Sequence, residues 1–532
     1  MKQVIIDIQV LQTNALKRGV GNYVINLIEN LDFENLDVYL MINLKLKNYN
    51  EIYTLFNNKP VKFLKLRLPI PKNGGDFSKK YHKKLTKKLA ISFKNNETFF
   101  LLPNIFMFDY YADFPDSFIP MILVHDITPL ILWNLLGNYF PPQFYFSRFK
   151  LFYNSNIIFT NSNTTKLDLI KYIGIDKRKL INLNGGSVNH EICQKPKFLD
   201  DNLVYILFPT GEMIHKNNEV VVEGFEKFNQ INNNKFKLII TSFFSQANKD
   251  KLLKISKNII FSGNVLEPEL AYLYKNSRLI IFGSLYEGLG LPVLDAVYYN
   301  KPIVLSDISA FREIDNKQNA FYFFNKKDSS ECAKQLSLAF KQHYFLKKQL
   351  SYKKILKKYS WKKTGRIFSQ SVLVNKERTI ANQVKLKKIA VVSLYPTVNF
   401  EFYNRLEPLH YLLKDGFLID YYFILSKNHT FLRPSFLEYV NQGDQHNNID
   451  QLSQKQYQNI IYWLDLKTLK TSKNIKLLKQ YPGVVIVDSI KNISQIDQQR
   501  LVDIKNNSTA FIVCNDKSNL KIISLIGKYI NN

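Results

Sequence analysis

A short glycine-rich loop carries the residue types best suited to chemistry. Gly283, Gly288 and Gly290 follow an apolar stretch that ends at Phe282, and Pro292 comes just after them. Because proline favours the first turn of a helix, the loop is expected to join a strand to a helix. Free backbone N–H groups in such a loop, together with the positive end of the helix dipole, can hold an anion. The pattern therefore predicts an anion-binding loop.

Two carboxylates belong to the same segment. Glu287 lies in the loop, and Asp295 follows eight residues later in the first turns of the expected helix. Both can face one cavity at the end of the strand, where a carboxylate accepts hydrogen bonds from vicinal hydroxyls such as those of a ribose or a hexose. A structural alternative stays open, because acids in a first helical turn often only balance the helix dipole and glycines there often only form a turn.

Parallel α/β sheets are the elements that would position these residues. Apolar strands alternate with helical patterns over residues 1–190, and a second such series runs from Val204 to about Tyr359. This alternation predicts two α/β domains with a cleft between them, and ligands beyond the carboxyl ends of the strands. The expected strands are Val4–Ile8, Asp37–Ile42, Thr98–Leu102, Pro120–Val124 and Asn156–Thr160, then Val204–Phe208, Lys237–Thr241, Asn258–Phe261, Arg278–Phe282 and Pro302–Leu305.

The run EGLGLPVLDA, which begins at Glu287, resembles the E-x7-E motif of family 4 retaining glycosyltransferases, usually EGFGLPVLEA. Further segments resemble the same family in the same order, namely Arg18–Ile28, Val124–Leu130, Thr160–Leu180, His215–Asn217, Asn258–Leu273 and Lys301–Ser306. The resemblance covers about residues 1–375. It implies a GT-B fold, with an acceptor-side domain at 1–195 and a domain for a nucleotide diphosphate sugar at 196–375.

The resemblance also implies roles for single residues. Lys216 should neutralise the leaving diphosphate, with His215 assisting if protonated, and Glu287 should contact the donor sugar or its phosphate. Asp295 should hold the ribose, and His125 should hydrogen-bond the donor sugar. The other expected donor-site positions are Gly211, Gly288, Leu289, Gly290 and Leu291, and those expected to line the cleft on the acceptor side are Gly19, Gly21 and Asp126. For Lys216 a solvated surface lysine, and for His125 a hydrogen-bonded histidine at a strand end, are the structural alternatives.

Two residues depart from the family pattern. Asp295 replaces the second glutamate and is one methylene shorter, and His215 replaces an arginine and so loses a permanent bidentate phosphate contact. Both keep hydrogen-bonding capacity, which favours an active enzyme over a degenerate one. The family needs no metal for the diphosphate and retains anomeric configuration, so no metal or other cofactor is expected. The donor is expected to be a GDP- or UDP-linked hexose, with mannose favoured by the resemblance to mannosyltransferases of surface-polysaccharide assembly.

The formal net charge of +29 predicts an anionic partner. Residues Phe77–Ile91 predict an amphipathic helix whose cationic half could lie on an anionic membrane beside a glycan or lipid-linked acceptor. That half carries Lys79, Lys80, Lys83, Lys84, Lys87 and Lys88, opposite Tyr81, Leu85, Leu89 and Phe93. The alternative is a surface helix whose apolar stripe packs on its own domain. No basic-aromatic module for nucleic acid is found, so nucleic acid is not expected as a partner.

A polar linker at 376–388 precedes a third α/β region at 389–532. Its opening, IAVVSLYPTVNFEFYN from Ile389, resembles the first strand and loop of another amino-terminal glycosyltransferase domain, but no second E-x7-E follows. We expect a truncated, Rossmann-like copy without catalytic activity, which serves assembly, acceptor positioning or stability.

The remaining features concern compartment and rival functions. Three cysteines without CxxC spacing, no apolar run long enough to span a membrane and no signal peptide pattern predict a cytoplasmic protein, with the inner face of the membrane as the expected place of work. Two rivals stay open. One is a sugar-nucleotide epimerase or a phosphorylase on the same fold, and the other is a catalytically impaired protein that only binds a sugar nucleotide.

Overall fold

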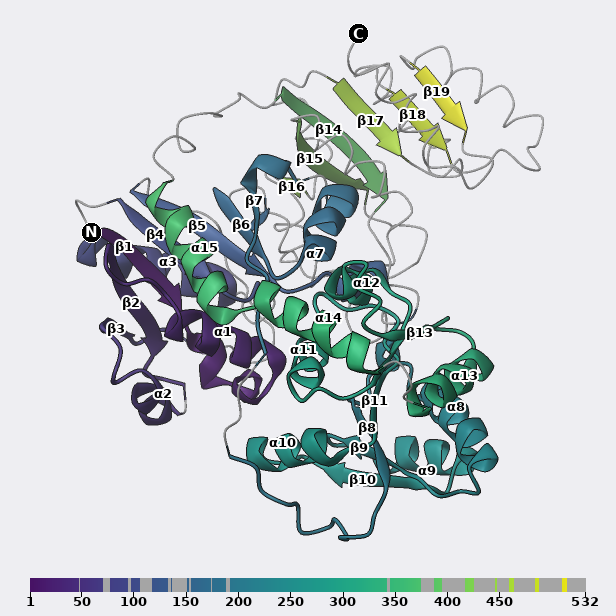
Figure 1. Cartoon of the computed structure of the whole chain (residues 1–532). Coiled ribbons are helices and arrows are strands. Elements are labelled where there is room, and N and C mark those ends of the chain that lie inside the picture. Colours follow the sequence, from purple (N-terminus) through teal and green to yellow (C-terminus); the bar gives the residue numbers. More distant parts are fainter. Residues whose placement is uncertain are drawn as a thin grey trace, which may run out of the picture.

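The computed structural model contains three parallel β-sheets (Figure 1). The structure describes residues 1–46, 48–69, 77–93, 97–105, 117–132, 135, 151–152, 155–173, 175–187, 192–341 and 345–374, and, beyond these, strands between 387 and 513. Each sheet has the strand order of a doubly wound fold, in which the first strand lies in the middle and the chain builds outward to both sides.

The first sheet has the order β3-β2-β1-β4-β5-β6-β7. Its strands are β1 (Lys2–Asp7), β2 (Leu36–Asn43), β3 (Val61–Leu66), β4 (Thr98–Leu102), β5 (Phe118–Val124), β6 (Ile157–Thr160) and β7 (Leu180–Asn182). The helices of this part are α1 (Gly19–Glu29), α2 (Tyr49–Leu55), α3 (Phe77–Ser92), α4 (Thr128–Ile131) and α7 (Asn163–Asp168), which continues as one π-helical turn. Strands β4, β5 and β6 are buried along their whole length, as expected for a sheet covered on both faces.

The second sheet has the order β10-β9-β8-β11-β12-β13. Its strands are β8 (Tyr205–Pro209), β9 (Lys237–Thr241), β10 (Ile259–Gly263), β11 (Leu279–Phe282), β12 (Ile303–Ser306) and β13 (Tyr322–Phe324). The helices are α8 (Asn218–Ile231), α9 (Gln246–Ile255), α10 (Glu267–Asn276), α11 (Leu291–Tyr298), α12 (Ser309–Asp315), α13 (Ser329–Phe340), α14 (Phe345–Lys358) and α15 (Trp361–Leu373). Alternate residues of β8 serve opposite faces, because Tyr205 and Leu207 join one hydrophobic cluster and Ile206 and Phe208 the other.

Helix α15 returns to the first domain (Figure 1). Its side chains Trp361, Phe368 and Val372 belong to the core built on the first sheet. Gly365 lets the two backbones meet, since a Cβ there would stand 1.8 Å from the carbonyl oxygen of Asn30, the residue after α1. The expected domain boundary at 375 therefore follows a helix whose apolar face is buried in the first domain.

Helix α3 confirms the helix expected at Phe77–Ile91. Leu85 and Leu89 are fully buried and Phe93 is nearly so, with its ring against Tyr39. The described part of the apolar stripe thus packs on its own domain, whereas Lys84 and Lys87 are exposed. No helix among the described residues is long and apolar enough to span a bilayer.

The third sheet has the order β16-β15-β14-β17-β18-β19, and all its pairings are parallel. Its strands are β14 (Lys387–Leu394), β15 (Phe417–Ile424), β16 (Gln445–His446), β17 (Asn459–Trp463), β18 (Val484–Val487) and β19 (Ala510–Val513). The first six strands of the first sheet follow the same order. The last of the three cysteines, Cys514, lies outside the described residues.

Candidate active site

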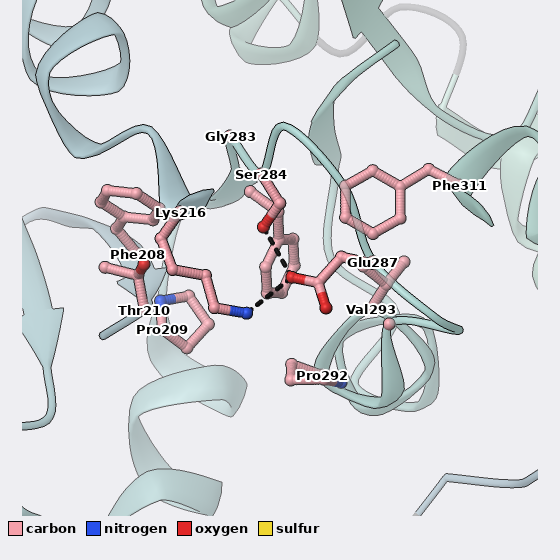
Figure 2. A pocket seen from close by; sticks show the side chains of 12 residues that line it. Phe208, Pro209, Thr210, Lys216, Gly283, Ser284, Glu287, Pro292, Val293 and Phe311 are labelled. Carbon is pink, nitrogen blue, oxygen red and sulfur yellow. Dashed lines mark hydrogen bonds and ion pairs between the residues drawn. The ribbon is translucent and has the colours of Figure 1, made fainter. Parts of the chain in front are cut away.

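A small pocket lies at the carboxyl ends of β8 and β11, the central strands of the second sheet (Figure 2). Its lining residues come from β8, the turn that follows it, the end of β11, the glycine loop after it, and helices α11 and α12. They are Phe208, Pro209, Thr210, Lys216, Phe282, Gly283, Ser284, Glu287, Gly290, Pro292, Val293 and Phe311. Glu287 and Lys216 therefore share one pocket at the sheet edge where the sequence predicts a ligand.

Lys216 and Glu287 point toward one another across this pocket (Figure 2). The ammonium lies 2.6 Å from Oε1 of the carboxylate, and the hydroxyl of Ser284 donates to the same oxygen, also at 2.6 Å. The side chains of Lys216 and Glu287 are 28% and 21% exposed. Burial alone would raise the pKa of Glu287, but the charges of Lys216 and His215 and these two hydrogen bonds outweigh it, so the pKa lies below its ordinary value.

The glycine loop is fixed to the turn after β8. The backbone N–H of Leu285 donates to the carbonyl of His215 at 2.8 Å, and the amide of Asn217 donates to the carbonyl of Gly283 at 3.0 Å. Lys326, which the sequence analysis did not single out, donates to the carbonyl of Leu285 at 3.2 Å. Gly290 has φ +93°, a conformation that favours glycine. The expected strand–loop–helix unit is present, and its loop is hydrogen-bonded to the turn after β8 and to Lys326.

His215 is held neutral near neutral pH. Burial and the neighbouring charge of Lys216 lower its pKa to about 4, although Glu287 and Asp126 act in the opposite direction. Its Nδ1 is buried and forms no hydrogen bond within the described part of the chain. The side chain therefore has an unused polar atom next to the pair formed by Lys216 and Glu287.

Asp295 lies half-buried on α11, apart from the side chains that line the pocket. Its charge acts on the phenols of Tyr274 and Tyr299, whose rings stack 5.4 Å apart. The structure thus places Lys216 and Glu287 together, and Asp295 on the next helix beside two tyrosines. The ribose contact expected of Asp295 stays a prediction.

His125 follows β5 and belongs to the first domain. Its Nε2 lies 2.9 Å from the carbonyl oxygen of Pro103, and its ring meets that of Tyr23 edge-on at 5.1 Å. Burial lowers the pKa of His125 to about 4. Asp126 caps the next turn by accepting from the N–H of Thr128 at 2.9 Å. The backbone of His125 and Asp126 lies directly opposite the glycine loop, because a Cβ on Gly288 would come within 3.0 Å of both residues.

The remaining expected site positions differ in how closely they are surrounded. A Cβ on Gly288 would stand 2.0 Å from the carbonyl oxygen of His125, and one on Gly21 2.3 Å from that of Ala15. A Cβ on Gly19 or Gly211 would meet no heavy atom within 4 Å. Leu289 is buried and Leu291 partly buried. Both side chains lie beside Gly185, where an added Cβ would contact them.

Among the described residues no cluster of acids, histidines or cysteines could hold a metal ion. Free cysteines in that part are Cys193, which is half-buried, and Cys332, which is buried. Sequence reasoning missed Ser284 and Lys326, and a polar residue two positions after the end of an expected strand is the signal that would have pointed to Ser284.

Residues 193–358 match the family model described as "Glycosyl transferases group 1". Two curated relatives extend the similarity. The "Serotype-specific mannosyltransferase WbdA" of Escherichia coli is 22% identical over 283 residues, which is 48% of this chain and 34% of that protein. The "O-antigen chain mannosyltransferase RfbU" of Salmonella typhimurium is 27% identical over 207 residues, which is 36% of this chain and 53% of that protein. The alignments thus span between about a third and a half of each relative.

Solved structures share the fold of the first two domains. Sucrose-phosphate synthase from Thermosynechococcus elongatus gives a TM-score of 0.54 at 12% identity, covering 70% of this chain and 98% of its own. Anabaena HepE, in complex with UDP and glucose, gives 0.51 at 11% identity, covering 70% of this chain and all of its own. The GT-B fold expected from the sequence is confirmed, and residues 193–358 form a group 1 glycosyltransferase domain.

Proposed function

We propose that this chain, which carries a group 1 glycosyltransferase domain, transfers a hexose from a nucleotide diphosphate sugar to a glycan or lipid-linked glycan, with retention of configuration. The observation that carries the proposal is the pocket shared by Lys216 and Glu287 at the carboxyl ends of β8 and β11. Relatives named as O-antigen mannosyltransferases support mannose as the hexose and surface polysaccharide as the product. The complex of HepE with UDP and glucose leaves a UDP-linked donor open beside a GDP-linked one.

The main requirement of this transfer is positive charge that stabilises the leaving diphosphate. The bond between the anomeric carbon and the diphosphate breaks with its electron pair on the phosphate oxygen, while the acceptor hydroxyl forms the new bond to that carbon and passes its proton to the released phosphate oxygen. Lys216 is placed to stabilise the charge that develops on the leaving diphosphate. The ammonium of Lys216 already contacts Glu287. We therefore expect the donor to bind at both side chains, with its phosphate at the ammonium and its sugar hydroxyls at the carboxylate.

We propose that the protein acts at the cytoplasmic face of a membrane that carries the acceptor. Helix α3 supports this through its exposed lysines alone, because its described apolar residues Leu85, Leu89 and Phe93 are buried in the first domain. Association would then be electrostatic and reversible rather than through insertion of a helix.

The third region, residues 389–532, is proposed to be a non-catalytic Rossmann-like domain. Its strand order repeats that of the first sheet, which supports an origin as a copied amino-terminal half. A full-length variant with the site of the second domain disabled should therefore have no remaining turnover.

The test is a panel of GDP- and UDP-linked sugars, assayed by nucleotide release with wild-type protein, Glu287→Ala and the exposed control Glu219→Gln. Wild type and the control should release nucleotide from at least one donor, and Glu287→Ala should lose at least about a hundredfold in rate. If a donor binds in calorimetry but is never turned over, the protein is a sugar-nucleotide binder. Epimerised donor without transfer would identify an epimerase instead.

A further inference from the structure

Both chain neighbours of Glu287 are held by the other domain. The phenol of Tyr286 donates to Oδ2 of Asp168 at 2.6 Å, and the hydroxyl of Ser162 donates to the carbonyl of Gly288 at 2.5 Å. Ser162 is the residue that caps the start of α7, and Asp168 is the last residue of that helix. Helix α7 of the first domain therefore contacts the glycine loop of the second domain with both of its ends.

A third contact ties α7 to the second domain. Glu313, on α12, accepts hydrogen bonds from the backbone N–H groups of Asn163 and Thr164 at 2.7 and 2.6 Å. The hydroxyl of Thr164 donates to the same carboxylate at 2.8 Å. Helix N-termini leave such N–H groups without partners within the helix, and here a side chain from the opposite domain provides the acceptor.

These contacts bear on the site through one residue. Glu287 stands between Tyr286 and Gly288, so restraint of both neighbours restricts where its carboxylate can lie. Within the second domain the loop is held at Gly283 and Leu285, and the carboxylate of Glu287 by Lys216 and Ser284, so the contacts from α7 add a restraint from the opposite domain on both sides of Glu287. Tyr286 is not among the residues that line the pocket, so its contact with Asp168 serves placement rather than contact with the donor.

We propose that α7, together with Tyr286 and Glu313, forms an interdomain clasp that positions Glu287 through its two chain neighbours. Tyr286, Asp168 and Glu313 are then positioning residues for the glycosyl transfer proposed above, on which this inference rests.

The clasp is tested with Tyr286→Phe, which removes only the hydroxyl. A matched control is Tyr205→Phe, because the phenol of Tyr205 donates to the carbonyl of Leu273 at 3.0 Å within the second domain. Tyr286→Phe should lower kcat/KM about tenfold, the size expected when a hydrogen bond to a charged group is lost. The control should lower the melting temperature at least as much and leave kcat/KM within about twofold.

Asp168 offers a rescue test. Asp168→Asn keeps an oxygen that can accept from Tyr286 and should retain most of kcat/KM, whereas Asp168→Ala should fall about tenfold. Adding Tyr286→Phe to Asp168→Ala should bring no further loss, because the two variants remove the same contact. Independent losses that multiply in the double variant would overturn the proposal.

Domain contact is measured apart from activity, by energy transfer between dyes on the two domains of the full chain. Glu313→Gln, which cannot accept all three hydrogen bonds in the same way, should shift the population toward separated domains, and Tyr205→Phe should not. An unchanged distance distribution in both Glu313→Gln and Tyr286→Phe would overturn the clasp. If wild type turns over no donor, the proposed function fails, while this measurement still decides the clasp.

Discussion

Gly288 and His125 bring the backbones of the two domains into contact, since a Cβ added to Gly288 would stand 2.0 Å from the carbonyl oxygen of His125. Gly288 belongs to the loop after β11, and His125 follows β5 in the first domain. Backbone offers no flexible end that could move aside, so a side chain at this position must displace one of the two segments. The glycine in the E-x7-E motif is therefore required here by the opposite domain.

Gly288→Ala should accordingly impair activity more than stability. We expect kcat/KM to fall by at least about a hundredfold, because a displacement of about 1 Å at the site has that effect. The control is Gly224→Ala, whose Cβ would stand 2.5 Å from Sγ of Cys332 inside the second domain. That variant should lower the melting temperature and leave kcat/KM of the folded protein unchanged. Equal loss of kcat/KM in both variants would show that Gly288 acts only through folding.

The pair of Lys216 and Glu287 predicts a stability effect with a defined pH range. In a cycle of Lys216→Met, Glu287→Gln and the double variant, urea unfolding should give a coupling free energy of about 1–3 kcal/mol near neutral pH. Because the folded pKa of Glu287 lies below the unfolded value of 4.5, the stabilisation is complete above 4.5 and is lost as the pH falls through the folded pKa. A coupling that persists unchanged at still lower pH would contradict the ion pair.

The sequence predicted the second domain well because its strands are short apolar runs between clear turn signals. Lys237–Thr241 is reproduced as β9 without change, and the helix after the glycine loop begins one residue before the expected Pro292. Strands that are polar or brief were missed, among them β3, in which Lys62 and Lys65 interrupt the apolar pattern. Within the first domain, β7 has only three residues and lacks the length on which periodicity depends.

The site was predictable where one local motif carries it. Glu287 could be read from the glycine loop, and Lys216 came from the resemblance of His215–Asn217 to the family segment. The contacts from Ser162 and Asp168 could not be read in this way, because they join residues 126 and 118 positions apart and depend on how two domains meet. The position of Asp295 near Tyr274 and Tyr299 likewise depends on packing of α10 against α11, which no local pattern encodes.

His215 should take up a proton when the donor binds. Its pKa of about 4 reflects burial and the charge of Lys216, and a diphosphate beside it would favour the charged form and raise that pKa. At about pH 6 the binding enthalpy should therefore vary with the ionisation enthalpy of the buffer, as measured by calorimetry. His215→Asn should remove this dependence. Uptake of the same size in His215→Asn would assign the proton to another group.

His125 should make the protein less stable in weak acid. Burial lowers its folded pKa from 6.5 to about 4, so between these values the unfolded chain binds a proton that the folded chain does not. Stability then decreases as the pH falls through this range, by at most about 1.4 kcal/mol per pH unit for this residue. Urea unfolding at several pH values should show that the free energy of unfolding changes less with pH in His125→Gln than in wild type. Equal changes would mean that the ring is accessible to protons in the folded state.

Helix α3 should bind anionic membranes through charge alone. Lys84 and Lys87 are exposed on it, whereas Leu89 is buried, so the helix cannot insert without unfolding its contacts. Vesicles with anionic lipid should therefore sediment wild type at low salt, and about 0.5 M salt should release it because exposed charges are screened. Lys84→Glu with Lys87→Glu should weaken binding about tenfold, and the same reversal at Lys353 and Lys354, exposed on α14, should not. Equal weakening in both would mean that the net charge, rather than α3, holds the membrane.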